Sequence, residues 1–558
     1  MGKYTIGLDF GTLSARAVVA DVCNGQIISS AVYAYPHGVM ADALPDGTPL
    51  PPDWALQHPG DYLEALWHIV PEALAQSGIP REDVIGIGVD FTSCTVFPVD
   101  ASGTPLCLLP AWAGTPHAYP KLWKHHAAQP YADAITRIAL ERKEDWLAYY
   151  GGKVSSEWSL PKLWQVLAEA PEVYDAMYAW AEAGDWLVWQ LTGRITQNAC
   201  AAGYKNFYRK GRGYPDPAFY RALDARLEHC IREKCFASVV PAGERAGALT
   251  EAMARRLGLL PGTAVSAAVV DAHAGVPAAG MRSPGQMLAI LGTSACYMTL
   301  SETGSAVPGI CGVQEDGMIP GLYGYEAGQS CMGDLFAWFC DHCVPGEYKA
   351  AADRCGQSIH QYLTGLAAAM RPGQSGLVAL DWWNGNRSVL ADFDLSGLLL
   401  GLTLQTRPEE IYRALLEAAA YGMRRIVENY REHGLTVHTV FATGGISQKN
   451  ALAMQIVADV LHLPVQVVEA DQGAALGSAI FAAAAAGADQ GGYDAVPEAI
   501  AAMHAPLQRA YQPRQESAAV YDALYAEYRL LHDYFGCGGN DVMKRLKALK
   551  HRVISEKD

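Results

Sequence analysis

The sequence predicts a two-domain α/β protein, and three observations support this prediction. Its 558 residues exceed what a single hydrophobic core usually supports. Strand and helix patterns alternate through the first half, as in a mixed α/β domain. A strand–turn–strand pattern rich in small and hydroxyl side chains occurs twice, at residues 4–21 and again at 287–300. We expect one domain over residues 1–280 and a second over 281–558, the second ending in a helical extension.

Composition narrows the class of protein. The net charge is -16, and the one lysine-rich stretch, residues 544–552, is too short to follow a phosphate backbone, so nucleic acid is not an expected partner. The chain opens on its first strand without a signal-peptide pattern, and no apolar run is long enough to cross a bilayer. Its 13 cysteines are scattered rather than spaced as a disulfide framework. We therefore expect a cytoplasmic protein with no membrane partner, and self-association stays open.

The first strand–turn–strand element predicts a phosphate-binding turn. Its opening strand carries Asp9, which can hold a hydrated Mg²⁺ ion. Backbone N–H groups and hydroxyls at the turn can bind a phosphate group. The alternative is an ordinary hairpin in which a glycine supplies a positive φ angle. The turn residues are Gly11, Thr12, Leu13 and Ser14.

Two further stretches of the first half are candidates for substrate contacts. The apolar strand at 84–90 ends in small polar residues that include Ser93, and ligands collect at the carboxyl ends of such strands. Residues 149–165 are dense in aromatic side chains against which a sugar can lie, with Glu157 and Lys162 as polar neighbours that can bind its hydroxyls. Lys205, further along, is a candidate donor to a hydroxyl or phosphate. A loop of small packing residues and surface salt bridges are the competing interpretations.

The junction between the two halves presents a carboxylate. A near-continuous apolar strand at 265–270 leads into Asp271, and small residues follow as far as Gly280. A carboxylate in this place can take the proton of a substrate hydroxyl while that hydroxyl attacks a phosphoryl group. Asp271 is also a candidate N-cap for the helix that follows, and the two roles are compatible.

The second half of the chain contains a second strand–turn–strand element and, later, a pair of glycines. The turn of its strand–turn–strand element consists of Gly292, Thr293 and Ser294. Two such elements imply related domains that face each other across a cleft and offer both turns to one phosphate tail. Chance recurrence of so short a pattern is the alternative. A later strand leads into Gly444 and Gly445, which allow the backbone to approach a flat ring such as adenine.

A helix is expected from Asn450 to Leu461, after this glycine pair. Residues 324–330, which include Glu326, are expected to form a loop before an aromatic-rich helix. The amphipathic stretch at 521–534 is expected to form a packing or subunit face.

Taken together, these segments resemble the FGGY family of carbohydrate kinases. The segments are residues 7–16, 271–275, 292–294 and 444–445 with Asn450, and they spread over most of the chain. The resemblance implies an α/β fold of two actin-like (ribonuclease-H-like) ATPase domains that flank a central cleft, with ATP and Mg²⁺ bound there.

The resemblance also implies roles for individual residues. Asp271 would be the general base and Asp9 the metal ligand. The two turns would flank the phosphates. Gly444, Gly445 and Asn450 would bind the nucleotide. Ser93, Lys205 and Glu326 would surround the sugar.

Within this family, residues 151–158, 326–330 and 381–387 resemble segments of the members that phosphorylate L-ribulose on its 5-hydroxyl. This implies a small-molecule sugar substrate and a place in L-arabinose catabolism, with D-ribulose as a further candidate substrate. A kinase for xylulose, glycerol or another polyol is the nearest alternative, and an actin-like ATPase switch without kinase activity is a more distant one. The pattern Gly-x-x-x-x-Gly-Lys-Ser/Thr of P-loop enzymes does not occur.

Overall fold

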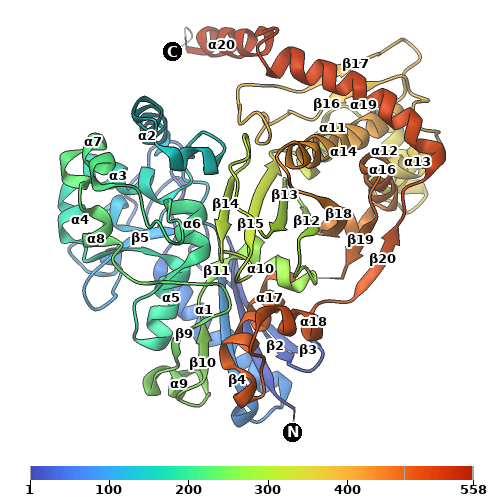
Figure 1. Ribbon diagram of the computed structural model, residues 1–558. Helices are drawn as coiled ribbons and strands as arrows, with labels where there is room; N and C mark the ends of the chain where they lie inside the picture. The colour runs from blue at the N-terminus through green and yellow to red at the C-terminus, as the bar shows by residue number, and fades with distance from the viewer. Residues whose placement is uncertain (1, 470–471, 556–558) are drawn as a thin grey trace.

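The computed structural model describes residues 2–469 and 472–555, and it contains two seven-stranded sheets (Figure 1). The first sheet has the order β3-β2-β1-β4-β10-β9, with the short strand β11 paired to the end of β4. β1, β2 and β3 form an antiparallel meander, whereas β1, β4 and β10 run parallel. The bounds are β1 Tyr4–Phe10, β2 Ser14–Asp21, β3 Ile27–Ala34, β4 Val84–Phe91, β9 Arg245–Ala248, β10 Ala264–Ser266 and β11 Val269–Val270.

The second sheet repeats this arrangement. Its order is β14-β15-β13-β12-β18-β19-β20, in which β12, β13 and β15 form the antiparallel meander and β12, β18 and β19 run parallel. The strand–turn–strand element that the sequence predicts twice is therefore part of a larger repeat. Both sheets combine three antiparallel strands with parallel strands in the same order. The bounds are β12 Gly285–Leu291, β13 Ala295–Ser301, β14 Gly312–Glu315, β15 Tyr323–Gln329, β18 Val437–Thr443, β19 Val465–Val468 and β20 Leu507–Tyr511.

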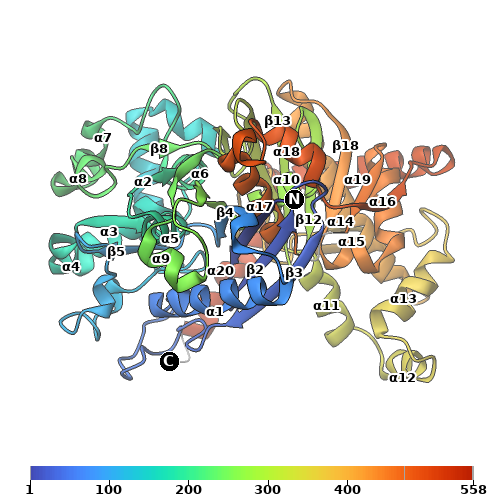
Figure 2. The same cartoon turned by 90° about the horizontal axis from the view of Figure 1, so that it is seen from below.

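Helices cover both faces of each sheet, and one helix per sheet comes from the other half of the chain. α1 (Pro59–Ser77) and α5 (Ala183–Thr192) pack on one face of the first sheet, and α17 (Gly473–Ala486) packs on the other face. In Figures 1 and 2, α17 lies beside the blue strands of the first sheet, and α18 (Val496–Met503), also orange to red by its late position, packs next to α17. α10 (Asp271–Ala278) contacts both α17 and the second sheet.

The contact between α17 and its neighbours depends on glycine residues, which have no side chain. A Cβ atom added to Gly7 would lie 1.8 Å from the carbonyl oxygen of Ala475, and one added to Gly477 would lie 1.7 Å from the carbonyl oxygen of Ala274. Backbone therefore meets backbone where α17 crosses β1 and α10, because only glycine leaves room for it.

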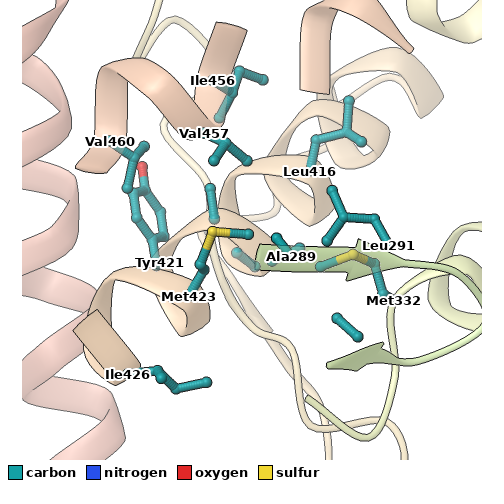
Figure 3. Close-up of a cluster of buried hydrophobic side chains, with 14 of the residues drawn as sticks. Ala289, Leu291, Met332, Leu416, Tyr421, Met423, Ile426, Ile456, Val457 and Val460 are labelled. Carbon is teal, nitrogen blue, oxygen red and sulfur yellow. The ribbon is translucent and has the colours of Figure 1, made fainter. Parts of the chain in front are cut away.

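The other face of the second sheet carries the largest core. α11 (Gly333–His342), α13 (Ile359–Ala368), α14 (Pro408–Glu432) and α16 (Ala451–Leu461) contribute apolar side chains to it. Figure 3 shows Leu416 and Met423 of α14 and Val457 of α16 around Ala289 of β12. α19 (Gln515–Gly536) packs on α16, and α20 (Val542–Ser555) extends beyond it at the C-terminal end.

The segment between β4 and β9 forms most of a lobe whose aromatic-rich core also includes Met40, Trp54 and Leu56, from the connection between β3 and α1. α6 in this lobe packs on β14, the edge strand of the second sheet, and joins the two halves a second time. Within the described residues, no helix has the length and apolar character needed to span a membrane. The bounds are β5 Val96–Val99, β6 Ala179–Glu182, β7 Gln197–Asn198, β8 Val239–Val240, α2 Gln129–Arg142, α3 Ser159–Glu169, α4 Pro171–Ala176, α6 Ala199–Asn206, α7 Pro217–Leu223 and α8 Cys230–Lys234.

Two local predictions were wrong. The apolar run at 265–270 is two short strands, β10 and β11, because Ala267 hydrogen-bonds to the carbonyl oxygen of Glu244 instead of continuing the ladder. Residues 324–330, predicted to be a loop, lie largely in β15. The glycines there suggest a loop, but Gly324 and Gly328 are where Tyr204 and Arg387 approach the strand closely.

Candidate active site

Three carboxylates meet at the carboxyl ends of neighbouring parallel strands. Asp9 of β1 pairs in register with Asp90 of β4. β11 lies on the other side of β4 and delivers Asp271 at the first position of α10. The parallel order of these strands therefore brings residues 9, 90 and 271 to one edge of the sheet.

Burial dominates the electrostatics of this carboxylate group. Burial and then the charge of Asp9 raise the pKa of Asp271 to about 7, while its Oδ1 accepts the Ala272 N–H at 2.7 Å. The pKa of Asp9 is also raised by burial, against the lowering effect of the Arg16 guanidinium, whose Nε lies 3.2 Å from Asp9 Oδ2. The Asp271 side chain does not cap α10, whose N-cap is Val270.

Asp90 is the member of this group that sequence reasoning missed. Its side chain is fully buried, and its Oδ2 accepts the hydroxyl of Ser478 in α17 at 2.7 Å. Burial and the charge of Asp9 raise its pKa well above the ordinary value. The sequence feature that could have identified Asp90 is an acidic residue at the end of an otherwise apolar strand.

The first turn, residues 11–14, is held from outside by side chains of its own domain. Its backbone closes through the Gly11 N–H and the Ser14 carbonyl at 3.0 Å. Gln57 donates to the Thr12 carbonyl at 2.7 Å, and the Trp123 indole donates to the Thr12 hydroxyl at 3.2 Å. The Leu13 side chain is 62% exposed.

The second turn, residues 292–294, is built in the same way. The Gly292 N–H reaches the Ser294 carbonyl at 3.0 Å, and the Thr293 carbonyl accepts the Met332 N–H at 3.0 Å, at the start of α11. Gly444 has a φ of 94°, and a Cβ there would lie 2.6 Å from the Leu291 carbonyl. The Gly444 turn therefore packs directly against the strand that leads into the second turn.

Gly445 and Asn450 follow on the same side. A Cβ on Gly445 would meet nothing within 4 Å, so the backbone there is accessible. Asn450 Oδ1 accepts the Ala453 N–H at 3.0 Å and caps α16, while its amide nitrogen donates to the Thr364 hydroxyl at 3.3 Å. The Asn450 side chain thus already has a structural role.

Glu326 is the centre of a buried charge cluster that spans the two halves of the chain. Lys205 of α6 lies 3.0 Å from Glu326 Oε2, and Arg387 lies 3.1 Å from Oε1. His273 Nε2 lies 3.3 Å from Oε2, and its Nδ1 lies 2.9 Å from Cys200 Sγ. Although burial raises the pKa of Glu326, the charge of Lys205 and then His273 and Arg387 bring it well below the ordinary value. Sequence reasoning assigned no role to His273 or Arg387.

Ser93 is half-buried on a loop that hydrogen bonds from buried side chains hold in place. The Thr92 and Thr95 hydroxyls are 2.9 Å apart, and Lys162 Nζ donates to the Cys94 carbonyl at 2.8 Å. Lys162 is fully buried and also donates to the Leu122 carbonyl at 3.0 Å. It therefore supports the loop from inside, and is not a surface salt bridge.

The carboxylate group and the charge cluster lie close to each other. The charges of Lys205 and Glu326 both act on the pKa of Asp271, after burial and Asp9. Asp271 also acts on the thiol of Cys296, two residues beyond the second turn, whose pKa burial raises to about 11. An acid that can accept a proton, a polar cluster and a hydroxyl-rich turn are thus adjacent.

Comparison with known families matches most of the chain to two domain models of one family. The model of the N-terminal domain of the FGGY family of carbohydrate kinases matches residues 4–277, and the model of its C-terminal domain matches residues 287–486. The chain belongs to the FGGY family of carbohydrate kinases. The sequence-based resemblance to this family is therefore confirmed, and the chain is an enzyme.

This FGGY kinase is similar to ribulokinases over its full length. It is 52% identical over 557 residues to ribulokinase from Geobacillus thermodenitrificans, covering 100% of this chain and 99% of the relative. It is 53% identical to ribulokinase from Halalkalibacterium halodurans, covering 99% of each, and 48% identical to that from Mycolicibacterium smegmatis, covering 98% and 96%.

Solved structures confirm the fold of this FGGY kinase. The crystal structure of xylulose kinase from Rhodospirillum rubrum has a TM-score of 0.77 at 24% identity, covering 95% of this chain and 98% of that one. Gluconate kinase from Lactobacillus acidophilus has a TM-score of 0.79 at 17% identity, covering 96% and 99%. The two-domain actin-like architecture predicted from the sequence is therefore correct.

Proposed function

We propose that this FGGY kinase is a ribulokinase, which transfers the γ-phosphoryl group of ATP to the 5-hydroxyl of L-ribulose in L-arabinose catabolism. The observation that supports this proposal is an identity of about half to ribulokinases along their whole length. D-Ribulose is a second substrate to be tested, because it carries the same terminal hydroxyl.

In the proposed mechanism, Asp271 takes the proton of the 5-hydroxyl as that oxygen attacks the γ-phosphorus. A pKa of about 7 suits this task, because a general base is most effective when its pKa lies near the working pH. The first and second turns position the phosphate tail, and Gly444, Gly445 and the Asn450 segment line the adenosine. Positioning and exclusion of water supply most of the catalysis in phosphoryl transfer.

Asp9 is the residue that we propose holds Mg²⁺. The donor set fits, because Asp9 offers carboxylate oxygens at a strand end beside Asp90 and Asp271, and Mg²⁺ prefers oxygen ligands. When bound, the ion neutralises charge on the phosphate oxygens. Arg16, 3.2 Å from Asp9, keeps this carboxylate oriented.

The sugar is proposed to lie against Ser93, Lys205 and Glu326. Lys205 and Glu326 belong to different halves of the chain, and together they offer donors and an acceptor to sugar hydroxyls. A sugar held by both halves favours closure of the cleft, which limits phosphoryl transfer to water.

Arg387 provides a test of this sugar site, because it acts through Glu326. Arg387→Gln is expected to raise KM for L-ribulose by about 10-fold, the loss expected for one charge-assisted hydrogen bond. The kcat and the KM for ATP should change by less than about threefold, and Arg387→Lys should restore part of the sugar affinity. Steady-state kinetics with each substrate varied in turn measure these effects.

Arg137→Gln is the matched control for this measurement, because Arg137 forms an exposed ion pair with Glu141 on α2. An equal rise in both KM values in Arg387→Gln, or no change in either, would contradict a role at the sugar.

The pH dependence of kcat/KM tests the base. Because burial raises the folded-state pKa of Asp271 to about 7, the reactive carboxylate predominates above that pH and is lost as the pH falls through it. We expect kcat/KM to fall about tenfold for each pH unit below about 7. An acid limb near pH 4 would assign the base to an unperturbed carboxylate.

The substrate is tested by measuring ADP formation with a panel of ketopentoses and polyols. We expect efficient turnover of L-ribulose and only slow ATP hydrolysis without sugar. Activity confined to xylulose or glycerol would overturn the substrate assignment. Turnover independent of any sugar would instead favour an ATPase switch.

A further inference from the structure

Two histidines and an aspartate meet at the rim of the first domain, outside the proposed active site. His37 follows β3, His58 precedes α1, and Asp61 lies in the first turn of α1. His37 Nδ1 lies 2.7 Å from Asp61 Oδ1, and His58 Nδ1 lies 3.8 Å from the same oxygen. The two imidazole rings are stacked, with centroids 4.3 Å apart and planes at 24°.

A histidine–aspartate hydrogen bond explains only half of this arrangement. His37 Nδ1 satisfies Asp61 Oδ1, and the His37 N–H donates to Asp61 Oδ2 at 3.1 Å. His58 Nδ1, however, is a buried atom without a hydrogen-bond partner, although it is directed at the same carboxylate. The carboxylate is itself only 3% exposed. An unpartnered buried nitrogen is costly unless something binds it.

We propose that His37, His58 and Asp61 bind a divalent transition-metal ion of the Zn²⁺ class through the two Nδ1 atoms and a carboxylate oxygen. All the ligand atoms lie within 4.8 Å of one another. Metal–ligand bonds of about 2.0–2.1 Å in a tetrahedral site place neighbouring ligands about 3.3 Å apart. The two observed histidine–aspartate distances, 2.7 and 3.8 Å, bracket that value. Because the imidazole rings are stacked, at least one ring has to rotate about its side-chain bonds before both Nδ1 atoms face one ion.

The chemistry of the ligands selects this class of ion. Two imidazoles and one carboxylate suit Zn²⁺ and its neighbours, whereas Mg²⁺ prefers an all-oxygen set. Burial and the adjacent His37 lower the pKa of His58, which keeps its imidazole neutral and able to bind metal. The His37 side chain is 37% exposed, which leaves access for the ion and for a water molecule as fourth ligand.

The position of this triad couples it to the first turn. Two residues before His37, the Tyr35 N–H donates to the Leu13 carbonyl at 2.9 Å. One residue before His58, Gln57 donates to the Thr12 carbonyl at 2.7 Å. A metal ion that joins His37 to His58 therefore also ties together the two segments that hold the turn, and makes it more rigid.

Titration of the metal-free full chain with Zn²⁺ and with Co²⁺ tests the proposal. We expect one tight site per chain, a Co²⁺ absorption spectrum of four-coordinate type, and a rise in thermal midpoint on Zn²⁺ binding that persists when Mg²⁺ is already at a saturating concentration. His58→Gln and Asp61→Asn should each weaken binding at least about tenfold. His37→Gln is the third variant, and it keeps the test decisive if one of the other two folds poorly.

Two controls separate this triad from other histidines. His68→Gln should leave Zn²⁺ binding unchanged, because His68 stacks on Tyr33 outside the triad. All titrations use a Cys537→Ser background, since His532, Asp533 and Cys537 form the other candidate group among the described residues. The proposal is overturned if the chain binds no Zn²⁺ in this background, or if well-folded His58→Gln and His37→Gln bind it as the parent does.

Discussion

Replacing Asp271 with Asn is expected to lower kcat by at least about 100-fold, while KM for L-ribulose stays within about threefold. The amide keeps the shape of the side chain and its position at the start of α10, but it cannot accept the substrate proton. Loss of a general base costs about 100- to 10,000-fold in rate. Initial rates of ADP formation at saturating ATP, with L-ribulose varied, give both constants.

The same variant should also lose the pH dependence near 7, because that limb belongs to the Asp271 carboxylate. Asp46→Asn is the control, since this exposed side chain bonds to Thr48 in a surface turn and accepts its N–H at 3.0 Å. A thermal midpoint close to that of the parent would show that Asp271→Asn is folded. Near-normal turnover by such a folded variant would place the base elsewhere.

Gly477→Val is expected to have the largest effect on stability. Its Cβ would lie 1.7 Å from the carbonyl oxygen of Ala274, so α17 and α10 have to separate where they cross. Overpacking a core costs about 1–3 kcal/mol, and a clash between two backbones lies at or beyond the upper end of that range. In a domain of this size each kcal/mol lowers the thermal midpoint by about 2–4 °C. Calorimetry should therefore show a fall of roughly 6 °C or more.

Gly365→Ala is the matched control for Gly477→Val. Gly365 also lies inside a helix, α13, but a Cβ there meets nothing within 4 Å. Alanine should raise the stability of that helix by about 0.5–1 kcal/mol. If Gly477→Val kept the parent midpoint, the close crossing of α10 and α17 would not contribute to stability.

Local patterns were sufficient to predict the strand–turn–strand elements and several of the helices around them. The strand–turn–strand elements were predicted correctly because short apolar runs on either side of a glycine-containing turn are signals within a few residues. β15 was not, because its glycines are there for Tyr204 and Arg387, which are distant in sequence. The packing of α17 on the first sheet was also beyond local reasoning, since Gly7 and Ala475 meet only in the folded chain.

Part of the proposed site could likewise be predicted, because some of its residues lie in local sequence motifs. Asp9, Asp271 and the two turns carry recognisable local motifs. Asp90, His273 and Arg387 act on their neighbours through tertiary contacts: Ser478 with Asp90, and Glu326 with the other two. The His37, His58 and Asp61 triad is likewise assembled from two segments, in which His37 and His58 are 21 residues apart.

The most direct test of the central claim is a crystal structure of the kinase with L-ribulose and a non-hydrolysable ATP analogue. We predict the 5-hydroxyl within hydrogen-bond distance of Asp271, and the terminal phosphate between residues 11–14 and 292–294. A sugar bound away from Asp271, or a nucleotide whose phosphates touch neither turn, would contradict this account.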